Sequence, residues 1–277
     1  MSELRSPIGI LDSGFGGLSV ALAVRAAMPA EDLVFAADCA FAPWGDRGAD
    51  FIDQRVHAIV DFLRSERIKA LVLACNTATA VSIDTLRTEL SIPVVGIEPA
   101  VFPGVRETET GVVGTLATVR TIASERYRHL SANALAWAKE NRPMPVSILD
   151  CPCPGLMECV ERGEFKSAHT LTLLEHYIAP LLAKGTDRLV LGCTHYPFLR
   201  EAIEAIIRKL APEKRVELID PAPAVAKQLA RTLATRKLCA PLETAGSVRF
   251  YATGANAARE AVLNALWQQN AQLEALQ

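Results

Sequence analysis

Two cysteines in this chain end stretches of very similar sequence. "LVLACNTATA" occupies residues 71–80 and "LVLGCTHYPFL" occupies residues 189–199. In both, a run typical of a buried strand reaches a cysteine, Cys75 or Cys193, directly before polar residues and the start of a helix. The N-terminus of a helix stabilises a thiolate and also binds carboxylates. One such cysteine is more often a small buried hydrophobe, but two in matching contexts indicate a functional pair of thiols.

A glycine-rich turn follows another strand. "LDSGFGGLS" (residues 11–19) has Ser19 where a dinucleotide-binding loop needs its third glycine, so the stretch is not a nucleotide loop. The glycines still allow the backbone to approach a small ligand. Asp12, at the strand end, could orient a neighbouring acid, base or ammonium group. The alternative is an ordinary turn in which Asp12 caps the next helix.

Further positions carry hydrogen-bonding groups. "DCAFAPWGDR" (residues 38–47) contains the turn Pro43-Trp44-Gly45, whose backbone N–H groups could meet a carboxylate, although alone it is more often an ordinary loop. Thr115 and Thr118 offer hydroxyls at another expected strand end. His195, two residues after Cys193, could exchange protons with a thiol or a substrate.

Several classes of function are disfavoured. Cys151, Cys153 and Cys159 lack the C-x₂-C spacing of a zinc site, and no strand-end motif supplies the lysine that a pyridoxal phosphate enzyme needs. The 29 basic and 31 acidic residues form no charged block, which argues against nucleic acid as a partner. There is no apolar run of membrane-spanning length and no signal peptide. With seven cysteines, an odd number, these features predict a cytoplasmic protein with free thiols.

The elements expected around these residues are apolar strands alternating with helices, a pattern typical of parallel sheets whose ligands bind beyond the strands' carboxyl ends. The strand that ends in a cysteine occurs twice, at Cys75 and at Cys193. This repeat predicts two similar parallel-sheet α/β domains, with the active site in the cleft between them. We expect one domain to comprise residues 1–99 plus 212–277 and the other residues 100–211. The strands are expected at 8–12, 33–38, 70–74, 94–97, 111–114, 146–149, 188–192, 216–219 and 248–251.

In this order, "GILDSGFGGLSV", "PWG", "ACNTATA", "GTLAT", "CPGLMECVERG" and "GCTHYPFL" strongly resemble glutamate racemase, of the aspartate/glutamate racemase superfamily. The resemblance covers roughly residues 8–255. It implies cofactor-independent interconversion of L- and D-glutamate for peptidoglycan synthesis. Glutamate is then the small-molecule partner, without nucleic acid or membrane, and whether the chain forms a homodimer stays open.

The resemblance also implies roles for individual residues. Cys75 and Cys193 would be the two catalytic bases, assisted by Asp12 and His195 respectively, and Glu161 falls where the family carries a glutamate near the second cysteine. The family usually has tyrosine where Trp44 stands, so a backbone contact is expected there. The substrate contacts would be Asp12, Ser13, Pro43, Trp44, Gly45, Asn76, Thr77, Thr115, Thr118, Thr194 and His195.

Two other functions are considered. One is a racemase or decarboxylase of the same superfamily acting on another small acid; the pair of cysteines argues against the single-thiol decarboxylases, and "LDSGFGG" favours glutamate over aspartate. The other is a carboxylate-binding protein that has lost its chemistry, against which Cys75 and Cys193 both count.

Overall fold

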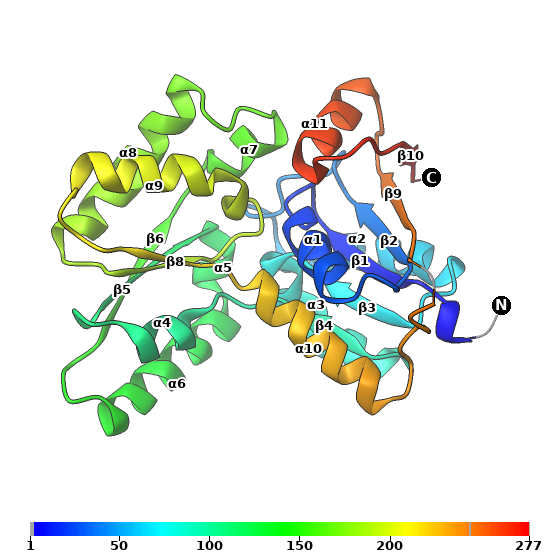
Figure 1. Cartoon of the computed structure of the whole chain (residues 1–277), viewed down its shortest axis with the longest axis horizontal. Helices are drawn as coiled ribbons and strands as arrows, with labels where there is room; N and C mark the ends of the chain where they lie inside the picture. Colours follow the sequence, from blue (N-terminus) through cyan, green and yellow to red (C-terminus); the bar gives the residue numbers. More distant parts are fainter. Residues whose placement is uncertain (1–2, 244, 277) are drawn as a thin grey trace. The chain divides into compact units, whose positions relative to one another are not determined.

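The computed structural model describes residues 3–243 and 245–276. The chain divides into two compact units, one made of Met1–Ile97 with Ala222–Gln277 and the other of Glu98–Pro221. Each unit is a parallel sheet with helices packed against it (Figure 1). The predicted fold class, two parallel-sheet α/β domains, is therefore confirmed.

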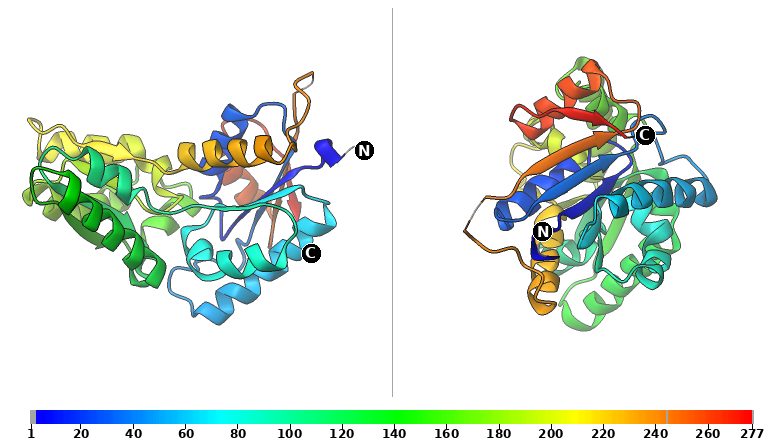
Figure 2. Two further views of the ribbon diagram at one scale, coloured as in Figure 1. Left: turned by 90° about the horizontal axis from the view of Figure 1, so that it is seen from below. Right: turned by 90° about the vertical axis from the view of Figure 1, so that its right-hand side faces the viewer.

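The first unit contains a six-stranded sheet in the order β10-β9-β2-β1-β3-β4, in which every described pairing is parallel. Figure 2 shows the strands from the C-terminal part of the chain lying beside those from its start. The strands are β1 (Ile8–Asp12), β2 (Leu33–Ala37), β3 (Ala70–Leu73), β4 (Val94–Gly96), β9 (Val248–Ala252) and β10 (Leu273–Ala275).

The central strands of this sheet are buried along their whole length, which explains their unbroken apolar sequences. Helices α10 and α11 both pack on α1, and α2 packs on α3. The helices of the unit are α1 (Leu18–Ala27), α2 (Ala49–Ser65), α3 (Asn76–Glu89), α10 (Ala222–Thr235) and α11 (Ala257–Trp267), preceded by a 3₁₀ turn at Glu3–Arg5.

The second unit contains a four-stranded parallel sheet in the order β6-β5-β7-β8. Helices α4 and α6 pack together, as do α8 and α9, and the two pairs lie on opposite faces of the sheet (Figure 1). The strands are β5 (Val112–Ala117), β6 (Ser147–Pro152), β7 (Arg188–Leu191) and β8 (Glu217–Ile219). The helices are α4 (Val101–Glu107), α5 (Val119–Ala123), α6 (Glu125–Asn141), α7 (Leu156–Glu161), α8 (Ala168–Ala183) and α9 (Arg200–Leu210), with a 3₁₀ turn, η2, at Tyr196–Leu199.

The two sheets repeat one arrangement: the order β2-β1-β3-β4 in the first corresponds to β6-β5-β7-β8 in the second. The register agrees as well, since Leu11 pairs with Leu73 and Leu116 with Leu191. In both sheets the next residue continues the ladder, with Ala74 N donating to Leu11 O at 2.8 Å and Gly192 N to Leu116 O at 2.7 Å. Cys75 and Cys193 therefore occupy equivalent positions, each two residues beyond the paired leucine of its own unit.

All nine expected strands are present, but some details differ. β5 and β6 extend three residues beyond their expected ends at 114 and 149, and β10 was not expected at all. The second crossing between the units also lies later than expected. β8 pairs with β7, so residues 212–221 belong to the second unit rather than the first.

Candidate active site

Cys75 follows β3 directly and is itself the N-cap of α3. Its backbone is extended, and its Sγ accepts a hydrogen bond from Ala78 N at 3.5 Å. Ser13 Oγ lies 3.6 Å from the same sulfur, and only 5% of Cys75 is exposed. A free helical N–H and the positive end of the helix dipole thus meet the thiol, where negative charge on sulfur is stabilised.

Asp12, the last residue of β1, is completely buried. Its Oδ2 accepts a hydrogen bond of 2.5 Å from Gly17 N at the start of α1. A Cβ at position 17 would lie 2.6 Å from Asp12 Cβ and 3.0 Å from Ala74 Cβ, so only glycine allows this approach. Asp12 and Ser13 are consecutive residues, and the hydroxyl of Ser13 is the one placed beside the Cys75 thiol.

Asn76 and Thr77 begin α3 and are both buried. Among the residues that the structure describes, neither the nitrogen nor the oxygen of the Asn76 carboxamide has a hydrogen-bond partner. Buried amides almost always have partners. This carboxamide is therefore suited to a polar ligand beside the Cys75 thiol.

The Pro43-Trp44-Gly45 segment follows a cis Ala42–Pro43 peptide bond. Trp44 is 1% exposed and packs in the same core cluster as Cys75, and its carbonyl accepts a hydrogen bond from Arg47 N at 3.1 Å. The indole N–H has no partner among the described residues. Sequence reasoning treated this stretch as a backbone turn and did not foresee that the Trp44 side chain fills the core.

Cys193 lies in a relay of three side chains in the second unit. Its Sγ is 3.5 Å from His195 Nδ1, and His195 Nε2 is 2.7 Å from Glu161 Oε1. Burial lowers the pKa of His195, but the charges and hydrogen bonds of Cys193 and Glu161 outweigh it, and the pKa is raised well above its usual value. Thr194, between the two, is also buried. The imidazolium can stabilise negative charge on the Cys193 sulfur when that thiol loses its proton.

The chain after Cys193 differs from the expectation of an immediate α-helix. It first forms the short 3₁₀ turn η2, and α9 begins only at Arg200. Tyr196 N donates to Cys193 O at 3.1 Å, and the buried Tyr196 hydroxyl lies 3.4 Å from Cys153 O. These contacts fix the loop that carries Cys193 and His195.

The two threonines occupy different settings. Thr118 caps α5, its Oγ1 accepting a hydrogen bond from Thr121 N at 3.2 Å. Thr115 lies inside β5 rather than at its end and is completely buried. Its hydroxyl has no hydrogen-bond partner among the described residues, whereas the nearby Tyr127 hydroxyl donates to Asp150. The expected strand-end position of Thr115 is therefore wrong, because β5 continues to Ala117.

Sequence reasoning missed the backbone groups that hold these side chains, Gly17 N at Asp12 and Ala78 N at Cys75. The signal for Gly17 was present, since a glycine follows the expected strand at the point where a helix must begin. Cysteine is not a preferred capping residue, so nothing in the sequence indicated that Cys75 caps α3.

Within residues 3–243 and 245–276, no three His, Cys, Asp or Glu side chains gather closely enough to hold a metal ion. No helix in the same ranges is long and apolar enough to cross a membrane. All seven cysteines are free thiols.

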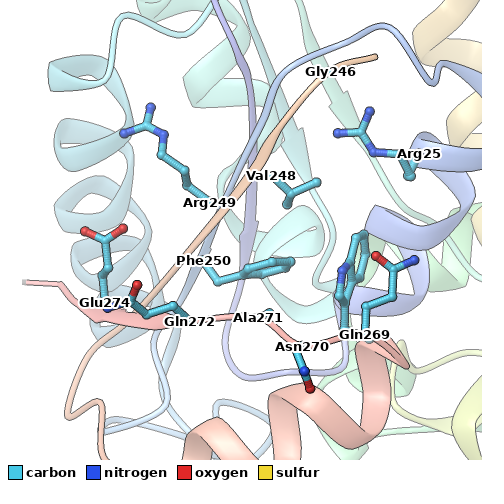
Figure 3. Close-up of a pocket in the computed structure, with 11 residues that line it drawn as sticks. Arg25, Gly246, Val248, Arg249, Phe250, Gln269, Asn270, Ala271, Gln272 and Glu274 are labelled. Carbon is cyan, nitrogen blue, oxygen red and sulfur yellow. The ribbon is translucent and has the colours of Figure 1, made fainter.

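A cavity of about 500 Å³ in the first unit lies beside β9 and β10 (Figure 3). None of the predicted site residues is among the described residues that line it. Its arginines are already engaged: Arg249 pairs with Glu66 at 2.6 Å, and Arg25 donates to the carbonyls of Pro29 and Ser247. The cavity is therefore separate from the predicted site residues.

The fold and these side chains define a protein of two repeated α/β units, each placing one buried thiol beyond the equivalent strand of its sheet. The sequence profile of the Asp/Glu/Hydantoin racemase family matches residues 18–229, and the chain belongs to this family. It is 40% identical over 99% of both chains to the glutamate racemase of Ectopseudomonas mendocina.

Two solved structures are also similar. The glutamate racemase of Francisella tularensis in complex with D-glutamate is 28% identical, with a TM-score of 0.81 over 99% of this chain and 98% of that one. The Escherichia coli glutamate racemase in complex with L-glutamate and the activator UDP-MurNAc-ala is 31% identical, with a TM-score of 0.80 over 98% of both chains. The chain is thus an isomerase, a racemase of this family.

Proposed function

We propose that this enzyme interconverts L- and D-glutamate without a cofactor, using Cys75 and Cys193 as its two acid–base groups. The observation that carries the proposal is the equivalence of the two cysteines, each two residues beyond a paired leucine in sheets of the same strand order. Support for glutamate as the substrate comes from the similar enzymes, one holding D-glutamate and another L-glutamate.

Inverting a carbon acid requires a base on one face of Cα and an acid on the other. A thiolate removes the proton from one face, and the opposite thiol donates its proton to the other face. In the reverse direction the two cysteines exchange roles. From the family resemblance we assign Cys75 to removal of the proton from D-glutamate and Cys193 to removal from L-glutamate.

The neighbouring groups would assist each thiol in its own unit. Ala78 N and Ser13 lie at the Cys75 sulfur, and the His195–Glu161 pair lies at Cys193. Fixed donors of this kind stabilise negative charge without reorganising during the reaction. The substrate itself would be held by Asp12, Ser13, Pro43, Trp44, Gly45, Asn76, Thr77, Thr115, Thr118, Thr194 and His195.

The product would serve peptidoglycan synthesis, as the resemblance to glutamate racemases implies. We place the enzyme in the cytoplasm, a location that the seven free cysteines support, because reducing compartments keep thiols from forming disulfides.

The proposal is tested by following the circular dichroism of purified enzyme with L-glutamate and no added cofactor. The signal should decay to zero as the racemate forms, and L-aspartate should decay much more slowly. A site that binds both carboxylates of glutamate leaves a donor unpaired with the shorter acid, which is costly. Comparable turnover of aspartate would overturn the glutamate assignment, and binding without turnover would indicate a carboxylate-binding protein instead.

A further inference from the structure

A second group of thiols lies in the second unit, at the end of β6 and beside the loop of Cys193 and His195, where Cys153 O accepts a hydrogen bond from Tyr196. Cys151 is near the end of β6, and Cys153 follows it two residues later. Their Sγ atoms are 4.0 Å apart, and the Cys153 thiol also lies 3.2 Å from Cys151 O. The proposed racemisation uses neither thiol. In the described part of the chain, they also do not join other His, Cys, Asp or Glu side chains in a cluster that could hold a metal ion.

The backbone brings these two side chains to the same side. In an extended strand, residues i and i+2 project from one face, and their Cα atoms lie roughly 6.6 Å apart at the usual rise per residue. Disulfides are found at Cα separations of about 4.4–6.8 Å. Their Cβ atoms lie at a similar separation, whereas a disulfide brings the two Cβ atoms to about 3.5–4.5 Å. Closing the disulfide therefore also requires the backbone to bend at Cys153, the first residue after β6.

The two thiols also differ in the way that thiol–disulfide exchange requires. Cys151 is half-buried, and its pKa is lowered because the Cys153 thiol donates a hydrogen bond to its sulfur. Cys153 is 3% exposed, and burial raises its pKa. The more accessible sulfur is thus the more easily ionised one, which makes Cys151 the attacking thiol and Cys153 the one that completes the disulfide.

We propose that Cys151 and Cys153 form a redox-active dithiol, a modification site that exchanges reversibly with small disulfides such as glutathione disulfide. The Cys151 thiolate attacks one sulfur of glutathione disulfide, forming a mixed disulfide and releasing one glutathione thiolate. The Cys153 thiol then loses its proton and attacks the Cys151 sulfur, releasing the second glutathione. The net reaction oxidises two protein thiols to one disulfide and reduces glutathione disulfide to two glutathione molecules.

The nearby cysteine of the same segment is not expected to take part. Cys159 lies in α7, where its thiol donates to Gly155 O at 3.3 Å and its sulfur receives a contact from Arg162 at 3.7 Å. Cys159 is also completely buried. Cys239 is exposed and would react with glutathione disulfide by itself, so the experiment uses the full chain with Cys239→Ser.

The experiment incubates this protein with glutathione disulfide, blocks the remaining thiols with an alkylating agent, and maps the peptides by mass. Cleavage after Lys139, Glu140 and Glu158 isolates residues 141–158, whose only cysteines are Cys151 and Cys153. This peptide should lose the mass of two hydrogen atoms and escape alkylation. Treatment with dithiothreitol should restore both thiols.

Two matched variants separate the steps. With Cys153→Ser, the exchange should stop at the mixed disulfide, so Cys151 should retain glutathione. With Cys151→Ser, residues 141–158 should stay unmodified because Cys153 is buried. Free Cys151 and Cys153 in the oxidised protein would overturn the proposal, as would a disulfide joining either of them to Cys193. No racemase assay is involved, so these outcomes do not depend on the proposed function.

Discussion

The Nε2 atom of His195 lies 2.7 Å from Glu161 Oε1, while the other ring nitrogen faces the Cys193 sulfur at 3.5 Å. Glu161 lies at the end of α7, 34 residues before the histidine. The carboxylate thus fixes the ring and favours its protonated form beside the thiol. A change in Glu161 should therefore alter both the titration of His195 and the stability of this part of the fold.

Glu161→Gln should lower the pKa of His195, which is observable as a shift in the pH titration of its imidazole resonances by NMR. Since the pKa of folded His195 is raised, the associated stability is complete below the unfolded value of about 6.5 and is lost as pH rises through the folded value. The variant should lose roughly 1.5–3 kcal/mol of unfolding free energy at about pH 6, and less at higher pH.

The control is Glu125→Gln, which removes the exposed partner of His129. Exposed pairs of this kind contribute little, so its unfolding free energy should stay close to that of the unchanged protein across the same pH range. An equal loss of stability at every pH in Glu161→Gln would contradict a role for the charge of His195.

Gly17→Ala should reduce activity by displacing Asp12. The added Cβ would lie 2.6 Å from Asp12 Cβ and 3.0 Å from Ala74 Cβ, and neither short side chain can swing aside. Overpacking of this kind costs about 1–3 kcal/mol, and a displaced Asp12 should lower kcat/KM about tenfold or more. Gly48→Ala is the matched control, because a Cβ there meets nothing within 4 Å. Unchanged kinetics in Gly17→Ala would contradict a role for the Asp12 position.

The loop that carries Trp44 depends on a buried ion pair. Asp38 is fully buried and accepts two hydrogen bonds from Arg55, at 2.8 and 2.7 Å, and one from Thr253 Oγ1 at 3.0 Å. Arg55→Leu should therefore cost about 3–5 kcal/mol, because it leaves the carboxylate without its cation. Denaturant unfolding measures this loss.

Two comparisons make the Arg55 experiment specific. Arg64→Ala, on the same helix, removes an exposed pair with Asp61 and should change stability by no more than about 0.5 kcal/mol. Adding Asp38→Asn to Arg55→Leu should recover part of the loss, since the unpaired charge is then gone. No recovery would show that packing, and not charge, explains the effect.

Most of the fold could be predicted because its strands are short apolar runs between helical patterns. β10 could not, since "LEA" is three residues long, largely exposed and placed at the sheet edge. The point at which the chain returns from the second unit to the first was missed for a different reason. The sequence around 217–219 indicates a strand but not the sheet that this strand joins. Strand pairing depends on tertiary contacts, which local sequence patterns do not contain.

The site could be predicted only in part, because its contacts also depend on tertiary packing that local sequence patterns do not contain. The matching contexts of Cys75 and Cys193 are visible in the sequence, and His195 is a near neighbour of the second. Glu161 was suggested only by the family resemblance, since no local spacing links it to His195. The indole of Trp44 lies in the core because surrounding strands and helices leave room for it, which the turn-forming sequence alone does not reveal.

Cys75→Ala and Cys193→Ala should each lower racemisation roughly a thousandfold or more, because each thiol is needed in both directions, once as base and once as acid. Circular dichroism in the far ultraviolet should show an unchanged fold. Cys239→Ala is the control, since that thiol is exposed and belongs to neither site. Full activity in either of the first two variants would remove that cysteine from the mechanism.

Racemisation in deuterated water distinguishes two thiols from a single base. A thiol holds one proton, so the hydrogen removed from substrate stays on the cysteine of that face, and the new hydrogen comes from the opposite cysteine, which has exchanged with solvent. Starting from protiated L-glutamate, the first D-glutamate should therefore carry deuterium at Cα, while the remaining L-glutamate stays protiated.

Short-time proton NMR or mass measurement of each separated enantiomer makes this comparison. One base serving both faces would return some of the original hydrogen to the product, since the abstracted proton would still be on the group that donates. In the proposed mechanism, Cys75 and Cys193, which occupy equivalent positions in the two repeated sheets, supply one thiol for each face. Substantial transfer of the original hydrogen into D-glutamate would exclude the two-thiol mechanism, even if both cysteines proved essential.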